Sequence, residues 1–324
     1  MVDLQPHYTV LSFAGSWEWV DIAGEDMQAE QIQELKSKHP ETVEWLKLTE
    51  RYETNYISVR FPDGIHPVIF GTLLYSVKEH IDSRRSCNVF HFYVSRDRLF
   101  TVNLDEHTRE TMKNKDRTVM LHQCGDAVDG MFVLARTVLH YFQRGMDRFE
   151  INLRELEDEM HDRNTRTLMD RILDARFELL FWSNLCIPFA EFITASKEAF
   201  TEEELNKSRF YSHLFHRVER LQQLINHYEK EISTLISIDD AVSAFRGNEI
   251  MKTLTIVTSV FTPATVVGAI WGMNFENLPW IKTGWGFAFT ITFTLSCMAG
   301  MYGWMRAKGW TGDLLKNNSK RKNL

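Results

Sequence analysis

Residues 248–279 read NEIMKTLTIVTSVFTPATVVGAIWGMNFENLP, and this stretch decides the fold of the C-terminal part of the chain. No charged residue occurs from Thr253 to Phe275. A helix rises about 1.5 Å per residue, so this uncharged run is long enough to cross the roughly 30 Å hydrocarbon core of a bilayer. The stretch therefore predicts a transmembrane helix.

A polar seam follows this predicted helix at alternating steps of three and four residues. Its members are Asn248, Met251, Thr255, Thr258, Thr262, Thr265 and Ala269. A period of about 3.5 residues suits a symmetric bundle of parallel copies that turns one seam towards a shared axis, where hydroxyl groups can wall a hydrated ion path. The other explanation is packing, because threonines in membrane helices often bond to a carbonyl one turn back or lie at close helix contacts.

The seam is followed by the triplet Gly272, Met273 and Asn274, and then by Phe275 and Glu276. Here the chain resembles the CorA family of divalent-cation channels, whose signature is Y/F-G-M-N at the end of the first of two C-terminal membrane helices. The resemblance runs without a gap over residues 248–279, through the patterns NExMKxLT, FxPxT and GMNFExxP. It implies a divalent-cation channel or transporter, with Mg²⁺ as the expected ion, assembled as a homopentamer.

The triplet is the predicted selectivity filter, and Asn274 is the predicted metal-site residue. Mg²⁺ gives up its water reluctantly, so a filter for the hydrated ion needs oxygen atoms that bond to the coordinated water. The carboxamide of Asn274, with the backbone carbonyls of Gly272 and Met273, suits that task in a symmetric ring. Glu276 is expected to attract cations to the outer mouth, and Met251 is the expected narrow apolar point of the path.

The whole 324-residue chain has 25% charged residues and a formal net charge of −7, so most of it outside the apolar runs is polar. This acidic balance argues against a nucleic-acid partner. The first 115 residues alternate strand and helix signals, which predicts an α/β domain with a mixed sheet. The predicted strands are residues 8–13, 17–22, 56–61, 68–75, 89–95 and 99–103, and the predicted helices are residues 26–37 and 41–48.

We therefore expect an α+β membrane protein in three parts. An α/β domain over residues 1–125 precedes a helical stalk domain over residues 126–247 and a transmembrane hairpin with a basic tail over residues 248–324. A helix starting after Thr201 shows no breaker before Gly247, and it is expected to continue into the membrane as the CorA resemblance implies. Leu214 opens a stripe of apolar residues at three- and four-residue spacing that is typical of a packed helix.

A second uncharged run, residues 284–305, predicts a return helix through the membrane. Basic residues mark both outer ends of this hairpin, and the N-terminus shows no signal-peptide pattern. The positive-inside rule then places both termini in the cytoplasm, as expected for a multi-pass protein of the plasma or bacterial inner membrane. The basic residues are Arg246 and Lys252 before the first span and Arg306, Lys308, Lys316, Lys320, Arg321 and Lys322 after the second.

Three further residues are weaker candidates for the cytosolic entry or for regulation. Asp240 continues the seam upstream by steps of four and can form an acidic ring at the cytoplasmic end of the path. His213 and His216 occupy the region where CorA-like chains often carry aspartates that bind regulatory Mg²⁺. Imidazole favours softer metals than Mg²⁺. Three explanations are open: the regulatory Mg²⁺ site lies elsewhere, the transported ion is not Mg²⁺, or the two histidines are ordinary helix residues.

No enzymatic function is expected, because the sequence holds no glycine-rich phosphate loop, G-x-S-x-G elbow or H-E-x-x-H motif. No cofactor is expected either. Mg²⁺ is expected as the transported ion and is also a candidate regulatory ion. The isolated His91 and His122 are expected to be structural or solvent-facing rather than metal ligands. Two rival functions stay open: a Zn²⁺ transporter of related architecture, and a membrane-anchored structural or signalling protein that does not conduct.

Overall fold

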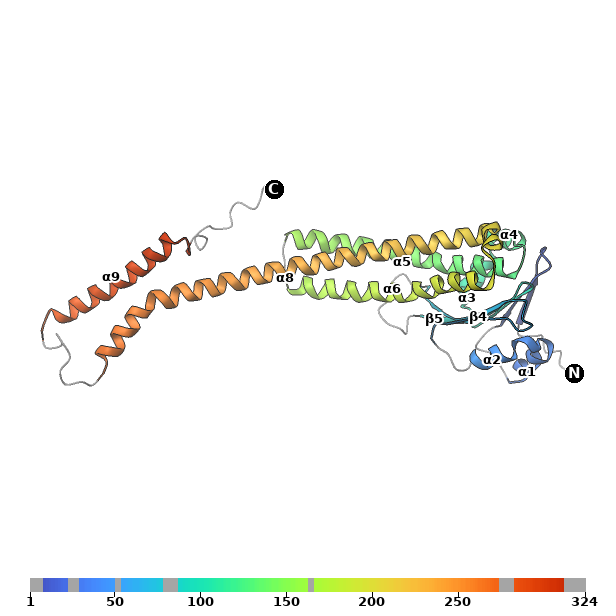
Figure 1. Cartoon of the computed structure of the whole chain (residues 1–324), viewed down its shortest axis with the longest axis horizontal. Helices are drawn as coiled ribbons and strands as arrows, with labels where there is room; N and C mark the ends of the chain where they lie inside the picture. The colour runs from blue at the N-terminus through green and yellow to red at the C-terminus, as the bar shows by residue number, and fades with distance from the viewer. Residues whose placement is uncertain are drawn as a thin grey trace. The chain divides into compact units, whose positions relative to one another are not determined.

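The structure is a computed structural model that describes residues 8–22, 29–49, 54–77, 87–162, 166–273 and 283–311. The chain divides into two compact units, Met1–Ile236 and Ser237–Leu324. Helix α8 (Arg209–Trp271) begins in the first unit and continues into the second (Figure 1). The long continuous helix predicted from the sequence is therefore present. The three-part division stays a prediction, and packing places the sheet and the helices that follow it in one unit.

A six-stranded mixed sheet lies in the first unit. Its strands are β1 (Tyr8–Ser12), β2 (Glu18–Ile22), β3 (Tyr56–Arg60), β4 (Val68–Tyr75), β5 (Asn88–Val94) and β6 (Arg98–Val102). Their order is β1-β2-β6-β5-β4-β3, with β2 and β6 parallel and every other neighbouring pair antiparallel. All six predicted strands are found, each within one residue at either end, and the mixed sheet is confirmed.

The two faces of the sheet bury two separate sets of apolar side chains, as the two-residue period of a strand requires. Trp19 packs into the core shared with α5 (Ala127–Asp162) and α6 (Arg166–Ala199), whereas Val20 packs on the other face with Leu35 and Trp45. Figure 1 shows α1 (Ala29–Lys38) and α2 (Val43–Thr49) across the sheet from α5 and α6. The other helical segments are η2 (Pro40–Thr42), α3 (Glu106–Lys113), α4 (Lys115–His122), α7 (Glu202–Lys207) and α9 (Gly286–Ala307).

The helix predicted to start after Thr201 is interrupted, so that prediction is wrong in one respect. Thr201 caps the short helix α7 with a capping box, as expected, but Ser208 leaves the helical conformation at φ −81° and ψ 113°. The Ser208 hydroxyl accepts a bond from Tyr211 N at 3.1 Å, which makes Ser208 the cap of α8, and it donates to Asp129 in α5. The break follows from these two side-chain bonds.

The first half of α8 packs along one face. The stripe that the sequence predicts is buried and is preceded by the buried Phe210 and Tyr211; it consists of Leu214, Val218, Leu221, Ile225, Tyr228, Ile232 and Leu235. All of them belong to the same core as α5 and α6. The helix therefore starts as an ordinary amphipathic helix of a folded domain.

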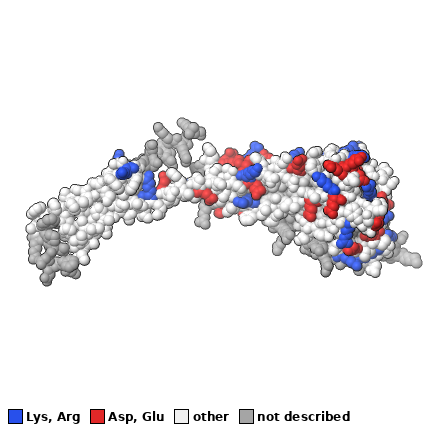
Figure 2. Space-filling view, viewed as in Figure 1, with Lys and Arg blue, Asp and Glu red and all other residues white. Residues whose placement is uncertain are grey.

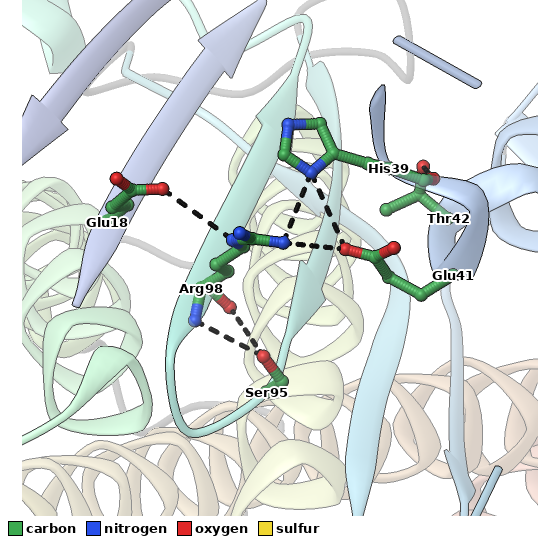
Figure 3. Close-up of polar contacts among 6 residues, drawn as sticks. All are labelled: Glu18, His39, Glu41, Thr42, Ser95 and Arg98. Atoms are coloured by element: carbon green, nitrogen blue, oxygen red, sulfur yellow. Dashed lines mark hydrogen bonds and ion pairs between the residues drawn. The ribbon is translucent and has the colours of Figure 1, made fainter. Parts of the chain in front are cut away.

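A polar network fastens the η2 segment to the end of strand β6 (Figure 3). Arg98 donates to the Glu41 carboxylate at 2.9 Å and lies 3.6 Å from that of Glu18, and its Nη1 is 3.3 Å from His39 Nδ1. Ser95 and Arg98 close the β5–β6 turn with backbone and hydroxyl bonds. Exposed ion pairs contribute only about 0.2–1 kcal/mol each, so the network sets the position of η2 more than it stabilises the fold.

Two glycines of α5 allow tryptophan rings to lie directly on the helix backbone. A Cβ placed on Gly145 would be 2.2 Å from the ring of Trp182, and one on Gly130 would be 2.5 Å from the ring of Trp17. Both rings are fully buried. A methyl group at either position would therefore collide with a ring that has no room to move.

We predict that Gly145→Ala lowers the free energy of unfolding by about 2 kcal/mol, because overpacking outweighs the gain in helix propensity. Gly247→Ala in α8 is the matched control, since nothing lies within 4 Å of its added Cβ. That change should be neutral or raise stability by up to about 1 kcal/mol. Thermal unfolding of the full-length variants measures both, and stabilisation by Gly145→Ala would contradict the packing described.

His91 is a structural histidine, as the sequence predicts. It lies on β5 opposite Thr72 of β4, is 8% exposed, and has its Nδ1 2.8 Å from the Thr72 hydroxyl. Burial lowers the pKa of His91 to about 4. His122 is exposed and packs its ring edge-on against Phe13.

Acid should therefore destabilise the first unit through His91. In the unfolded chain its pKa is about 6.5, so below that pH the unfolded state binds a proton that the folded state refuses. The stability that the neutral His91 allows is fully present above pH 6.5 and decreases as the pH falls towards 4. The loss in the free energy of unfolding is about 2 kcal/mol at pH 5. Unfolding measured from pH 7 to pH 5 should depend less on pH in His91→Gln, and equal slopes would contradict this assignment.

Candidate functional site

The predicted seam lies on one exposed side of α8 in the second unit. All of its members are exposed in a single chain, with Met251 at 62%. The opposite side carries Ile256, which is 7% exposed, and the half-buried residues Lys252, Val260, Pro263 and Val267. Successive residues turn by about 100°, so Thr258 points about 160° away from Ile256. The second unit thus covers one side of α8 and leaves the seam side open.

The seam threonines bond to their own helix. Thr255 donates to the Met251 carbonyl at 2.8 Å, Thr262 to that of Thr258 at 2.7 Å and Thr265 to that of Phe261 at 3.2 Å. Thr258 donates in the same way to Leu254. This is the bonding that the packing explanation expects, and it does not exclude an ion path. A hydroxyl has one hydrogen and two lone pairs, so each seam oxygen keeps an acceptor free.

Apolar side chains surround the seam on this part of α8. Ile250, Leu254, Val257, Phe261 and Val266 are about half exposed or more, although a soluble helix would bury such residues. Figure 2 shows the charged residues gathered over the first unit, while the C-terminal part of α8 and α9 carries few. This surface is suited to lipid or to other copies of the helix.

Two described helices have the length and hydropathy to cross a membrane, α8 and the stretch Thr167–Ala199 of α6. The apolar window of α6 is 56% buried within the first unit, so packing in a domain core explains it. The window of α8 is 6% buried. Helix α9 matches the predicted return helix in position and has Arg306 as its one charged residue, but none of its 18-residue windows is as hydropathic as these two. The crossing by α9 therefore stays a prediction.

Helix α8 ends at the predicted filter. Gly272 N donates to the Gly268 carbonyl at 2.9 Å, and Met273 N to that of Ile270 at 3.3 Å. A Cβ on Gly272 would lie 2.8 Å from the Gly268 oxygen, so glycine is required for this close approach. Asn274 and Glu276 lie outside the residues that the structure describes. Their predicted roles as filter and outer mouth therefore remain predictions.

Asp240 lies on the seam side of α8, exposed and eight residues before Asn248. At about 1.5 Å per residue its Cα is about 12 Å further along the helix axis. Its carboxylate is on the same side as the seam residues, as the step-of-four pattern predicts. An acidic ring of Asp240 between copies of the chain stays a prediction.

His213 and His216 are exposed on the first part of α8, and neither is placed in a metal site. The Nδ1 of His213 is 3.5 Å from an Arg136 guanidinium nitrogen, and its pKa is lowered by burial and by Arg136 and Arg209. His216 Nδ1 is 3.5 Å from the Glu219 carboxylate. No group of three or more histidine, cysteine or acidic side chains that could hold a metal occurs within the described ranges. A regulatory metal at these histidines would need ligands from elsewhere.

Sequence reasoning did not single out the arginines that gather around Arg136. Arg117, Arg136 and Arg217 come from three different helices, and Arg217 donates to the Arg136 carbonyl at 3.1 Å. No local motif marks them, since each looks like an ordinary surface arginine in its own segment. Only the packing of α4, α5 and α8 brings them together.

The chain is similar to known transporters along nearly its whole length. The magnesium transport protein CorA of Bacillus subtilis (strain 168) is 28% identical over 306 residues, which cover 94% of this chain and 95% of the relative. The complete structure of the CorA magnesium transporter from Methanocaldococcus jannaschii superposes with a TM-score of 0.66 at 20% identity, over 91% of this chain and 92% of that one. The full-length CmaX protein gives 0.57 at 15% identity, over 95% and 90%. At such identities the two structures show a shared fold.

A family model assigns the chain to a family more directly than the pairwise similarities do. The model described as CorA-like Mg²⁺ transporter protein matches residues 15–307, which include strands β2 to β6, the helices and the seam. The fold agrees, since the mixed sheet, the long α8 and its apolar end correspond to a full-length CorA structure. The resemblance noted in residues 248–279 is thus confirmed, and this chain belongs to the CorA-like Mg²⁺ transporter family, whose members are ion transporters and not enzymes.

Proposed function

We propose that this protein is a divalent-cation channel that conducts hydrated Mg²⁺ along the α8 seams of five identical copies. The observation that carries the proposal is a row of exposed hydroxyl oxygens on an otherwise apolar helix that ends at the triplet of Gly272, Met273 and Asn274. An anchor helix has no need of such a row. The CorA family relationship supports the same function, since the B. subtilis relative is a magnesium transport protein.

The chemistry of the seam suits a hydrated cation. The water molecules bound to Mg²⁺ point their hydrogens outward, so the wall of the path must accept hydrogen bonds. Each seam hydroxyl donates its hydrogen to a backbone carbonyl one turn back, so its oxygen can still accept a hydrogen bond. A ring of such oxygens from several copies would replace outer water around the ion without taking its first hydration shell.

The proposed path has polar residues at both ends and one narrow apolar point near its cytoplasmic end. Five Asn274 carboxamides, with the carbonyls of Gly272 and Met273, would select the hydrated ion at the outer mouth, where Glu276 would attract it. Met251 would form an apolar constriction near the cytoplasmic end, and Asp240 would concentrate cations beyond it. Both α8 and α9 would cross the cell membrane, with the two termini in the cytoplasm.

The first test of this proposal is ion flux. We predict that the full-length protein in liposomes takes up Mg²⁺ and that Asn274→Ala lowers this uptake at least about tenfold, because the ring of carboxamides is lost. Equal yield and elution volume of the variant would show that it still assembles. Uptake of Zn²⁺ alone would move the assignment to a zinc transporter, and flux of neither ion would favour a non-conducting membrane protein.

A second prediction concerns the seam itself. Thr258→Val keeps the shape of the side chain and removes one acceptor ring, so Mg²⁺ uptake should fall about fivefold. Thr253→Val is the matched control: Thr253 makes the same back-bond, 2.9 Å to the Glu249 carbonyl, but points about 160° away from Thr255. Uptake should stay unchanged in this control. Equal loss in both variants would mean that the threonines serve helix packing only.

A further inference from the structure

A group of basic side chains gathers where α4, α5 and α8 meet in the first unit. We define the basic cluster by its members, which are Arg117 of α4, Arg136 and His140 of α5, and His213, Arg217 and Arg220 of α8. Arg117, Arg136 and Arg217 are half-buried, and the other three are exposed. The cluster is separate from the seam, which belongs to the second unit.

Direct contacts fix the two helices of the cluster against each other. The Arg217 guanidinium donates to the Arg136 carbonyl at 3.1 Å, and the Arg136 guanidinium lies 3.5 Å from His213 Nδ1. Arg220 donates to the side-chain oxygen of Gln143 at 3.0 Å. His140 follows Arg136 by one turn, and Arg217 follows His213 by one turn, so each helix presents its basic side chains on one face.

Several arginines elsewhere in the first unit pair with a carboxylate, whereas among the described residues the four arginines of the cluster do not. Arg60, Arg96, Arg98, Arg109, Arg154 and Arg171 each form an ion pair with an aspartate or glutamate. Across the described residues no such pair is found for Arg117, Arg136, Arg217 or Arg220. The side-chain hydrogen bond of Arg117 goes to the sulfur of Met120 at 3.5 Å, a weak acceptor.

The positive charges of the cluster repel one another. Burial, together with the charges of Arg136, Arg220 and Arg117, lowers the pKa of Arg217 to about 10. The pKa of Arg117 falls through burial and Arg136, and that of His140 through burial, Arg217 and Arg117. The nearby carboxylates of Asp116, beside Arg117, and Asp147, beside His140, offset only part of this charge.

We propose that the basic cluster binds a small phosphate anion of several negative charges, such as a nucleoside polyphosphate or inorganic polyphosphate, that bridges α5 and α8. Guanidinium groups bind phosphate oxygens in pairs, and they do so most strongly where water is partly excluded. A small ligand fits better than a nucleic acid, because the chain as a whole carries a net charge of −7 and would repel a long polyanion. The bound anion would supply the counter-charge that the four arginines lack.

The experiment measures binding of sodium tripolyphosphate to the full-length protein in detergent and a buffer free of divalent cations, so that metal chelation plays no part. We expect saturable binding by calorimetry and a higher unfolding temperature. Arg117→Gln and Arg220→Gln should each weaken binding about tenfold, since each removes one charged hydrogen-bond donor. Neither side chain is bonded to the backbone, so both variants are expected to fold.

Arg176→Gln is the matched control. Arg176 is exposed on α6 beside Phe177 and Glu229, and the change removes the same single charge away from the cluster. Binding by this variant should equal that of the native chain. Comparison of tripolyphosphate with ATP then separates the sources of the phosphate: much tighter binding of ATP identifies a nucleotide site, and equal affinity identifies a polyphosphate site.

Three outcomes would overturn the proposal. The first is absence of saturable binding at millimolar tripolyphosphate, and the second is equal weakening by Arg176→Gln, which would indicate a diffuse charge effect. The third is a change in oligomer mass for Arg117→Gln or Arg220→Gln without phosphate binding, which would make the cluster a contact between copies of the chain. The proposal is independent of transport, which is tested by ion flux, so the two can fail separately.

Discussion

Helix α8 has to suit two different surroundings with one continuous ladder of backbone hydrogen bonds. Up to Leu235 it buries a single apolar stripe against α5 and α6, and its remaining sides face water. From Ile250 onward apolar side chains stand out on most sides and are left uncovered in a single chain. Such a surface is stable in lipid or against further copies, and only a helix or a closed barrel keeps the backbone satisfied there. The position of every seam residue follows from this continuity.

The threonines of the seam show how polar atoms can be kept in an apolar helix. A hydroxyl without a partner in such surroundings costs free energy, and the bond to a carbonyl one turn back removes that cost. The bond also decides what the hydroxyl offers to its surroundings, since the hydrogen is used and the lone pairs are not. Packing and ion conduction are therefore not opposed explanations of Thr255 or Thr265. Packing in an apolar environment requires this bond, and ion conduction can use the acceptor that the bond leaves on each oxygen.

Charge is distributed differently in the two units (Figure 2). In the described part of the first unit several arginines pair with carboxylates, as Arg109 does with Asp21 at 2.7 Å, whereas the arginines of the basic cluster form no such pair. In the second unit the described part of the chain between Thr253 and Met273 carries no charge at all. In the proposed channel, cations passing this uncharged stretch would rely on neutral oxygens along it and on charges at its ends.

The sequence by itself determined the six strands, the apolar stripe of α8, the seam and the family, because each depends on a local period or a short run of residues. Only the tertiary structure decided the β1-β2-β6-β5-β4-β3 order, the break at Ser208 and the contact of Arg217 with Arg136. Ser208 ends a predicted helix because its hydroxyl reaches Asp129, which no window of neighbouring residues contains. The structure also showed which side of α8 is left uncovered, since coverage depends on what packs there. Local periodicity fixes where a side chain points along its own element, whereas contacts between distant segments depend on how the whole chain packs.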